Sequence, residues 1–256
     1  MAPGACAAGH WPHIGDRGGR QRVLTVVPEE TRLEINGAAP GDRYVVNSYL
    51  GSPTEVRPGA QAFLVRQEKP LLRPHFHEVD QFQVVMDGVG ELGGDDALPG
   101  LIHYTDAYTA YGPIRTNPAV GTLTYLTLRR HAAVGANFMP ESRVKRREAG
   151  GGGEHFVVQL GALPGEMSAT AELARTARGA VAFEARAAPG EKLGLPAGGE
   201  GQEGYAVVFD GGIHVGGRDV EKGGLVWFTG PGELALARAA AHGSTVAVLL
   251  FAPGTT

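Results

Sequence analysis

Short runs of apolar and β-branched residues follow one another along the chain from residue 23, and glycine or proline separates most of them. In the first half they read VLTVV, RYVVNSYL, AQAFLVRQ, FQVVM, GLIHYTDAY and GTLTYLTL. In the second half they read HFVVQL, AVAFEAR, GYAVVFD, GLVWFTG and STVAVLLF. Runs of this length and composition predict β-strands joined by tight turns. Helical periodicity is scarce, and the best helix candidate covers residues 167–178.

The two halves of the chain resemble each other. Residues 82–88 align without a gap on residues 205–211. Glycines then fall into the same register, with Gly93, Gly94 and Gly100 in the first half and Gly216, Gly217 and Gly223 in the second. A repeat with glycines in matching turns predicts two copies of one β unit. Closure of each copy into a barrel removes its exposed strand edges, so we predict two barrels.

Composition divides the chain into four segments. Residues 1–22 have no periodic apolar pattern and are expected to be loosely attached. Residues 23–145 form the predicted first barrel and residues 155–256 the second. Between them, the stretch 146–154 contains four consecutive glycines and is interpreted as a flexible linker.

Charge and cysteine content limit the functional classes. The net charge of −4 is spread over both signs, so no broad basic field for nucleic acid is present. The basic cluster 143–147 lies beside the glycine run and is interpreted as a solvated face. The single cysteine, Cys6, permits no disulfide within the chain. No apolar run is long enough to span a membrane and no secretory signal is evident, so a cytoplasmic protein is expected.

The segment 73–82 contains the residues best suited to chemistry. His75 and His77 lie two positions apart in an expected strand, so both imidazoles should leave it on the same face. Imidazole binds Zn, Cu, Fe and Ni, which makes this face a candidate metal site. Gln81 follows across a short turn and offers an amide oxygen as a further ligand.

At this point the sequence resembles the cupin superfamily. The family's first motif has H-x-H, three or four residues, Glu, six residues and Gly. This chain has His75-x-His77, three residues, Gln81, six residues and Gly88, so glutamine replaces the acid. The glycine that leads the family motif would fall at Lys69. The resemblance implies an all-β chain of two double-stranded β-helix barrels, with a metal held by both histidines and by residues of neighbouring strands.

Two residues compete for the last ligand position that the resemblance implies. His103 follows Pro99-Gly100 in a superficial match to the second family motif. Counting instead from a turn at Gly100 places Tyr111 there, and the internal repeat favours this register. Tyrosine binds a metal as phenolate only if its pKa of about 10 is lowered. Otherwise its hydroxyl donates a hydrogen bond or acts as a general acid, so Tyr111 and His103 are the catalytic candidates.

The repeat register leaves the second barrel without a matching ligand set. The positions equivalent to His75, His77, Gln81 and Tyr111 are Gly198, Glu200, Gly204 and Leu234. The second barrel is therefore interpreted as scaffold, and we expect one pocket in the chain. Several aromatic residues lie near the motif as candidate pocket lining, namely Phe76, Phe82, Tyr104, Tyr108 and Tyr111.

The resemblance implies a metal-dependent enzyme acting on a small organic substrate, with aromatic compounds among the candidates. An oxygenase with Fe(II) is the leading expectation, and Zn, Ni, Mn or Cu are alternative ions. Two other functions stay open, which are non-redox isomerisation, cyclisation or lyase chemistry, and non-catalytic binding of a small ligand without metal. The glutamine and tyrosine departures favour the last of these. A homodimer is a further expectation, again by analogy with two-barrel cupins.

Overall fold

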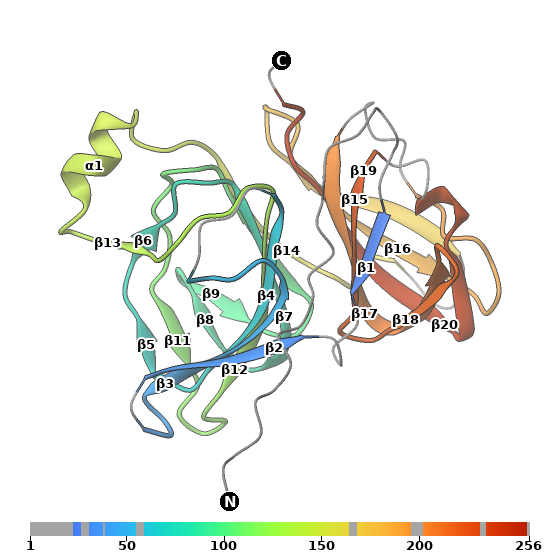
Figure 1. Ribbon diagram of the computed structural model, residues 1–256, viewed down its shortest axis with the longest axis horizontal. Coiled ribbons are helices and arrows are strands. Elements are labelled where there is room, and N and C mark those ends of the chain that lie inside the picture. Colours follow the sequence, from blue (N-terminus) through green and yellow to red (C-terminus); the bar gives the residue numbers. More distant parts are fainter. Residues whose placement is uncertain are drawn as a thin grey trace, which may run out of the picture.

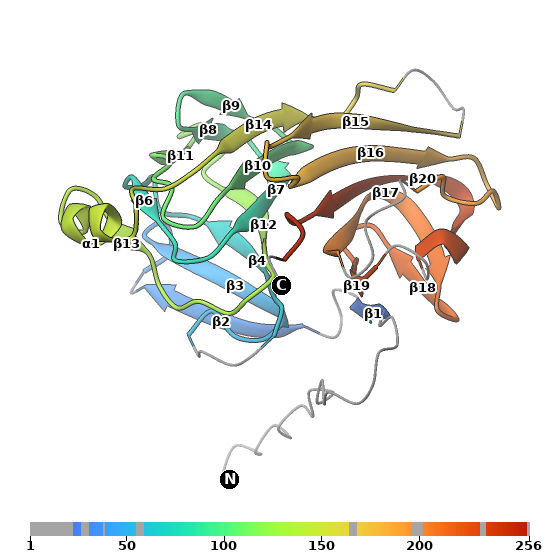
Figure 2. The same cartoon turned by 90° about the horizontal axis from the view of Figure 1, so that it is seen from above.

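The computed structural model describes residues 23–26, 31–37, 39–54, 59–163, 168–195, 202–230 and 234–254. Nearly all of its regular structure is β-strand, and the strands form two lobes that lie side by side (Figures 1 and 2). This confirms the predicted all-β chain of two barrels. The segment 1–22 lies outside the described residues. Within the described part of the chain, no helix is long and apolar enough to cross a membrane.

The N-terminal lobe consists of a seven-stranded sheet, a four-stranded sheet and a short strand pair. The large sheet runs, in spatial order, β14 (His155–Gln159), β10 (Leu101–Thr105), β7 (Gln81–Gly88), β12 (Leu123–Arg129), β4 (Gln61–Gln67), β3 (Arg43–Leu50) and β2 (Arg32–Gly37). The four-stranded sheet runs β5 (Leu71–Leu72), β11 (Ile114–Thr116), β8 (Gly90–Leu92) and β9 (Asp95–Ala97). The strand pair joins β13 (Asn137–Phe138) to β6 (His75–Phe76).

The C-terminal lobe is built on a second seven-stranded sheet. Its strands run β1 (Val23–Val26), β19 (Leu225–Thr229), β17 (Glu203–Val215), β20 (Arg238–Leu250), β16 (Val181–Ala187) and β15 (Ala169–Arg175), and β18 (Arg218–Glu221) pairs with β17. A 3₁₀ turn, η2 (Leu234–Leu236), precedes β20.

The helix predicted at residues 167–178 is wrong. Residues 169–175, inside the expected helix 167–178, form strand β15, because they pair antiparallel with β16. Tertiary pairing thus overrides the weak helical pattern. The basic cluster, interpreted from the sequence as a solvated face, forms helix α1 (Arg143–Glu148), which has no buried residue.

Identical contacts in the two lobes confirm the repeat. In the N-terminal lobe the amide of Gly100 donates to the carbonyl of Val85 at 2.8 Å. In the C-terminal lobe Gly223 donates to Val208 at 2.9 Å, and both residues lie where the sequence alignment places them. Gly88 and its equivalent Gly211 have φ values of +86° and +69°. A Cβ there would lie 2.3 Å and 2.1 Å from a carbonyl oxygen of the neighbouring strand, so both turns require glycine.

The strands at the predicted domain boundaries pair with the opposite lobe. Strand β1, at the start of the expected first barrel, joins β19 of the C-terminal sheet. Strand β14, at the start of the expected second barrel, joins β10 of the N-terminal sheet. The chain therefore crosses between lobes twice. The division into two separate domains stays a prediction.

Three apolar clusters hold the structure together. One fills the N-terminal barrel around Val85 and Tyr125, and one fills the C-terminal barrel around Val208 and Phe228. The third contains residues of both lobes, among them Phe82, Tyr104, Tyr205 and Phe251. Phe82 and Tyr104, which we considered as pocket lining, thus belong to the core between the lobes.

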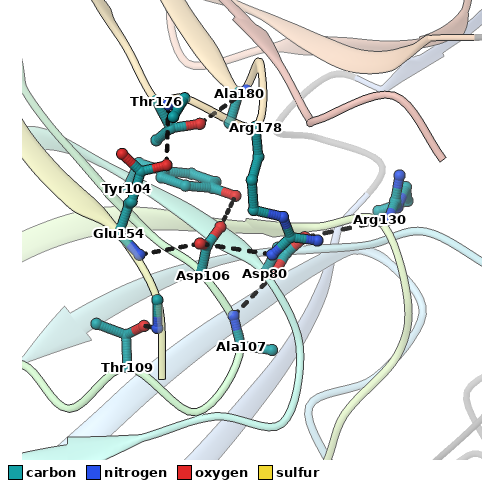
Figure 3. A network of polar contacts seen from close by, with 12 residues as sticks. Asp80, Tyr104, Asp106, Ala107, Thr109, Arg130, Glu154, Thr176, Arg178 and Ala180 are labelled. Atoms are coloured by element: carbon teal, nitrogen blue, oxygen red, sulfur yellow. Dashed lines mark hydrogen bonds and ion pairs between the residues drawn. The ribbon is translucent and has the colours of Figure 1, made fainter. Parts of the chain in front are cut away.

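A polar network lies at the edge of the core between the lobes (Figure 3). Asp106 accepts hydrogen bonds from the Tyr104 hydroxyl at 2.7 Å and from the Glu154 amide at 2.9 Å. Arg178 of the C-terminal lobe approaches the same carboxylate at 3.5 Å. The glycine run packs against this turn, since the Gly153 amide donates to the Thr109 hydroxyl at 2.8 Å. The segment interpreted as a flexible linker is therefore closely packed at its end.

Candidate functional site

Polar side chains fill one end of the N-terminal barrel. Cross-strand pairs place them in two adjacent rows on the inner face of the large sheet. One row contains Gln61, Arg129, Gln81 and Thr105, and the next contains Thr127, Gln83 and His103. All seven are buried, and we call them the polar cluster. Alternate residues of each strand share this inner face, and further along it the residues are mostly apolar, apart from the buried Gln67.

His75 and Tyr111 join the polar cluster from outside the large sheet. A β-bridge pairs their backbones, with N···O distances of 3.1 Å and 3.0 Å. The Tyr111 hydroxyl lies 2.8 Å from His75 Nε2, and Gln81 Nε2 donates to the hydroxyl oxygen at 2.6 Å. His75 Nδ1 lies 2.8 Å from the Arg73 carbonyl, which can only accept. His75 therefore carries its proton on Nδ1, and Nε2 accepts the Tyr111 proton.

Arg129 is the buried cation of the polar cluster. Its Nε donates to Gln81 Oε1 at 3.1 Å. Its Nη1 donates to Gln61 Oε1 and to the Ala133 carbonyl, each at 2.9 Å. The guanidinium also lies 5.2 Å from the ring centroid of Phe63. Burial lowers the pKa of Arg129 to about 10, which still leaves it charged at neutral pH.

His77 and His103 complete the surroundings of Tyr111. The His77 ring lies 5.2 Å from that of His75, and its buried Nδ1 has no hydrogen-bond partner. The His103 ring lies 4.8 Å from that of Tyr111, and its Nδ1 bonds Gln83 Oε1 at 3.0 Å. Burial lowers the pKa of His75 to about 4 and that of His103 to about 3. Burial, and then the charge of Arg129, holds the pKa of His77 well below its usual value.

The loop before Tyr111 is strained where it touches His77. Tyr108 has a φ of +60°, the only positive value at a non-glycine residue in the described part of the chain. Its amide donates to the His77 carbonyl at 2.7 Å, and its carbonyl accepts from Arg146 at 3.0 Å. Such strain costs about 1–3 kcal/mol and tends to occur at functional sites.

The structure brings together every site residue that the sequence suggested. His75, Gln81 and Tyr111 are in direct contact, while His77 and His103 lie beside them. Of the two candidates for the last position, Tyr111 bonds both His75 and Gln81, whereas His103 bonds Gln83. Which of them completes the site stays a prediction. The sequence interpretation missed Arg129, Gln61, Gln83 and Thr127. Alternation along the strands was the available signal, since it puts these residues on the inner face.

The ion implied by the cupin resemblance requires lone pairs, and hydrogen bonds within the site already use several of them. The His75 Nε2 lone pair accepts from Tyr111, and the Gln81 oxygen accepts from Arg129. Burial raises the pKa of Tyr111 above its usual value, so its hydroxyl stays neutral. No three His, Cys, Asp or Glu side chains of the described ranges gather as ligands. Gln81 stands where the family has glutamate, and the cation Arg129 is bonded to its oxygen. This donor set therefore does not fit a tightly held divalent metal.

The C-terminal lobe provides an internal comparison for the polar cluster. The same strand pairs occur there, for example Leu250 beside Gly204 in place of Arg129 beside Gln81. The equivalents of Gln61, Gln81, Gln83, His103, Thr105, Thr127 and Arg129 are Val181, Gly204, Ala206, Val226, Phe228, Val248 and Leu250. Each polar residue thus has an apolar or glycine counterpart. A Cβ at Gly204 would lie 2.8 Å from Phe228 and from Leu250, so this end of the second barrel is filled.

Comparisons with known proteins agree with the architecture. No family model matches the sequence, and no curated protein matches it. A candidate dioxygenase from Nostoc punctiforme has a TM-score of 0.59 and 10% identity, over 91% of this chain and 82% of that one. The 11S globulin from Wrightia tinctoria, described with an auxin binding site, has a TM-score of 0.57 and 12% identity, over 90% and 83%.

A third solved structure is the bacterial pirin from Escherichia coli in complex with nickel(II). Its TM-score is 0.55 at 10% identity, and the match covers 91% of this chain and all of that chain (100%). These relatives are two-barrel cupin proteins with different functions, so the likeness shows the architecture and not an activity. Together with the duplicated strand pairs, the likeness shows that the chain has the two-barrel fold of these cupin proteins.

Proposed function

We propose that the polar cluster and the adjoining His75 and Tyr111 bind a small organic ligand and transfer a proton on it. The comparison between the lobes carries this proposal. The C-terminal barrel folds in the same register with apolar residues at these positions. The fold therefore does not require the seven buried polar groups of the N-terminal barrel. Burying polar groups is costly, so their presence in one lobe only favours a ligand site.

The hydrogen-bonded chain from Arg129 to His75 suits proton transfer. A substrate proton can pass to the Tyr111 oxygen while the hydroxyl proton passes to His75 Nε2, and the reverse step returns both. Gln81 donates to the Tyr111 oxygen and is itself polarised by Arg129, so negative charge on that oxygen is stabilised. The reaction class is non-redox, such as isomerisation or a lyase step.

A metal-dependent enzyme, with Fe(II) and oxygenase activity foremost, is the second candidate. One observation favours it, namely that His77 Nδ1 is buried without a hydrogen-bond partner beside His75. The nickel-bound pirin among the structural relatives supports the same possibility by analogy. No step is derived through a metal, because the remaining donors do not fit one.

Metal content separates the two candidates. The protein is expressed with Fe, Zn, Ni, Mn and Cu supplements, purified without chelator and analysed by mass spectrometry. We expect less than about a tenth of an equivalent of each metal, since tight ligation needs several free donors. The variant His75→Ala/His77→Ala is the control for adventitious binding. A metal at near one equivalent that this variant loses would contradict the proposal and favour the metalloenzyme.

Ligand-dependent thermal shifts test the site itself. A panel of small organic acids, amides, ketones and phenols is added to the wild-type protein and to Tyr111→Phe. A binder raises Tm of the wild-type protein. We expect the wild-type protein to convert a binder into product, as followed by NMR, and the Tyr111→Phe variant not to do so. Binding without conversion of any binder would leave a non-catalytic binding module and contradict the proton-transfer step.

A further inference from the structure

Among the residues that the structure describes, no buried acid balances the charge of Arg129. Its hydrogen-bond partners are the oxygens of Gln81, Gln61 and Ala133, all of them neutral. In the described part of the chain its Nη2 has no hydrogen-bond partner, and it forms no ion pair. An isolated charge inside a protein is costly unless it is paired.

The buried carboxylates of the protein are engaged elsewhere. Over the described ranges, the only acids that are buried are Asp106 and Glu184. Asp106 belongs to the network between the lobes, where Arg178 is its cation (Figure 3). Glu184 pairs with Arg186 at 2.7 Å and accepts two backbone amides. Neither acid supplies the missing negative charge at Arg129.

Two further polar atoms near Arg129 are without partners. Ser48 Oγ is fully buried and unsatisfied, and Ser48 pairs across the strands with Phe63, whose ring lies under the guanidinium. His77 Nδ1 is the other. Buried polar atoms are rarely left unpaired in a folded protein, so these two indicate groups that a ligand satisfies. The equivalent of Arg129 in the C-terminal lobe is Leu250, so the barrel itself does not require the cation.

We propose that the ligand of this site is a small organic monocarboxylate whose carboxylate pairs with Arg129. This inference rests on the proposed ligand site. One guanidinium balances one negative charge, and its free Nη2 has two N–H groups, either of which can donate to a carboxylate. A phosphate dianion would bring a second charge that no other buried cation of the cluster neutralises. The pairing holds the ligand within reach of the Tyr111 hydroxyl.

Matched acids and amides test the inference. Formate, acetate and benzoate are compared with formamide, acetamide and benzamide by thermal shift and calorimetry, with ionic strength held constant by sodium chloride. Each pair has nearly the same shape and differs in charge. We expect the acid of at least one pair to bind about tenfold or more tightly than its amide in the wild-type protein.

Three variants show whether Arg129 causes the preference. Arg129→Gln should abolish it, whereas Arg129→Lys should keep it in weaker form because the charge remains. Arg130→Gln is the matched control, since Arg130 is the next residue and bonds the Ala252 carbonyl instead. If Arg129→Gln fails to fold, the acid and amide affinities of Arg129→Lys and of the wild-type protein still test the inference.

The possible failures can be told apart. Equal binding of acid and amide, or a preference that survives Arg129→Gln, would overturn the carboxylate inference and leave the ligand site standing. Binding of neither member of any pair, nor of any compound in the wider panel, would overturn the ligand site and the inference together.

Discussion

At the scale of single residues, the polar cluster, His75 and Tyr111 form hydrogen bonds mainly with one another. Tyr111 donates to His75 and accepts from Gln81, and Gln81 in turn accepts from Arg129. Removing one member of such a chain leaves its partners buried and unpaired, which costs about 1–3 kcal/mol for each. Replacing a whole set of partners by apolar groups can be neutral. Single and combined substitutions should therefore behave differently.

Replacement of Tyr111 by phenylalanine tests the single-residue case. Tyr111→Phe leaves His75 Nε2 and Gln81 Nε2 without partners, so the free energy of unfolding should fall by about 1–3 kcal/mol. Urea denaturation measures it. The control is Tyr125→Phe, which removes one longer bond of 3.2 Å to Gln67 and should cost less. An equal or larger loss for Tyr125→Phe would contradict the account.

The buried histidines make stability depend on pH. The pKa of His75 falls to about 4 and that of His103 to about 3, against 6.5 when exposed. The unfolded chain therefore binds more protons below pH 6.5. The free energy of unfolding should be at its full value above that pH and decrease as the pH falls towards about 4, by up to about 1.4 kcal/mol per pH unit for each histidine.

Urea denaturation at several pH values between about 7.5 and about 5 measures this slope. His103→Gln should reduce it, because one proton fewer is taken up on unfolding. The exposed His242 provides the control, and His242→Gln should keep the wild-type slope. A wild-type stability that is constant or rises as the pH falls would contradict the burial of neutral histidines.

At the scale of elements, strand alternation and glycine turns explain why much of the architecture could be predicted. The strand runs and the repeat register depend on local pattern, and the equivalent bonds of Gly100 and Gly223 confirm them. The spacing of His75 and His77 was likewise visible. Arg129 was not, because its burial depends on the long-range pairing of β12 with β4 and β7. Strand β15 was missed for the same reason.

The glycine run after α1 shows how local composition misleads. Gly152, with a φ of +94°, would place a Cβ 2.6 Å from the Tyr108 carbonyl oxygen. Gly151 has a similar φ of +88° but no atom within 4 Å of its Cβ position. Composition alone predicted a flexible linker. The structure instead shows a segment that is packed at Gly152 and open at Gly151.

This difference gives a matched pair of substitutions. Gly151→Ala should cost only the backbone strain, about 1 kcal/mol, whereas Gly152→Ala adds a clash with rigid backbone and should cost at least about twice as much. Chemical denaturation of the two variants measures these losses in the free energy of unfolding. Similar losses for both would show that the run is a loose linker, as its composition suggests.

At the scale of the whole molecule, the C-terminal lobe supports the site directly. The Tyr205 hydroxyl donates to the backbone carbonyls of Arg129 at 2.9 Å and Gln61 at 3.2 Å. Both residues belong to the polar cluster of the other lobe. The lobes also share an apolar core and exchange strands at their ends. The C-terminal lobe therefore positions the polar cluster as well as covering one face of the N-terminal barrel. The homodimer suggested by analogy stays a prediction.

Tyr205→Phe tests this coupling between the lobes. Loss of the hydroxyl leaves two buried carbonyls with one donor fewer, so stability should fall by about 1–3 kcal/mol. Binding of any ligand found in the thermal-shift panel should weaken as well, because the strand ends that carry Arg129 and Gln61 are loosened. Tyr49→Phe is the control, since its hydroxyl also joins the lobes, at Gly223, but away from the cluster. Equal effects of both variants on ligand binding would contradict the coupling.

The central claim is that the polar cluster serves a ligand and not the fold. The most direct measurement is the free energy of unfolding of Gln61→Val/Gln81→Met/Arg129→Leu, in which Val and Leu are the residues of the C-terminal lobe and Met keeps the volume of Gln81. The account predicts a stability within about 2 kcal/mol of wild type, because removal of the buried charge offsets the donors that the Ser52 and Ala133 carbonyls lose, together with loss of ligand binding. A fall of several kcal/mol, or binding that survives, would contradict it.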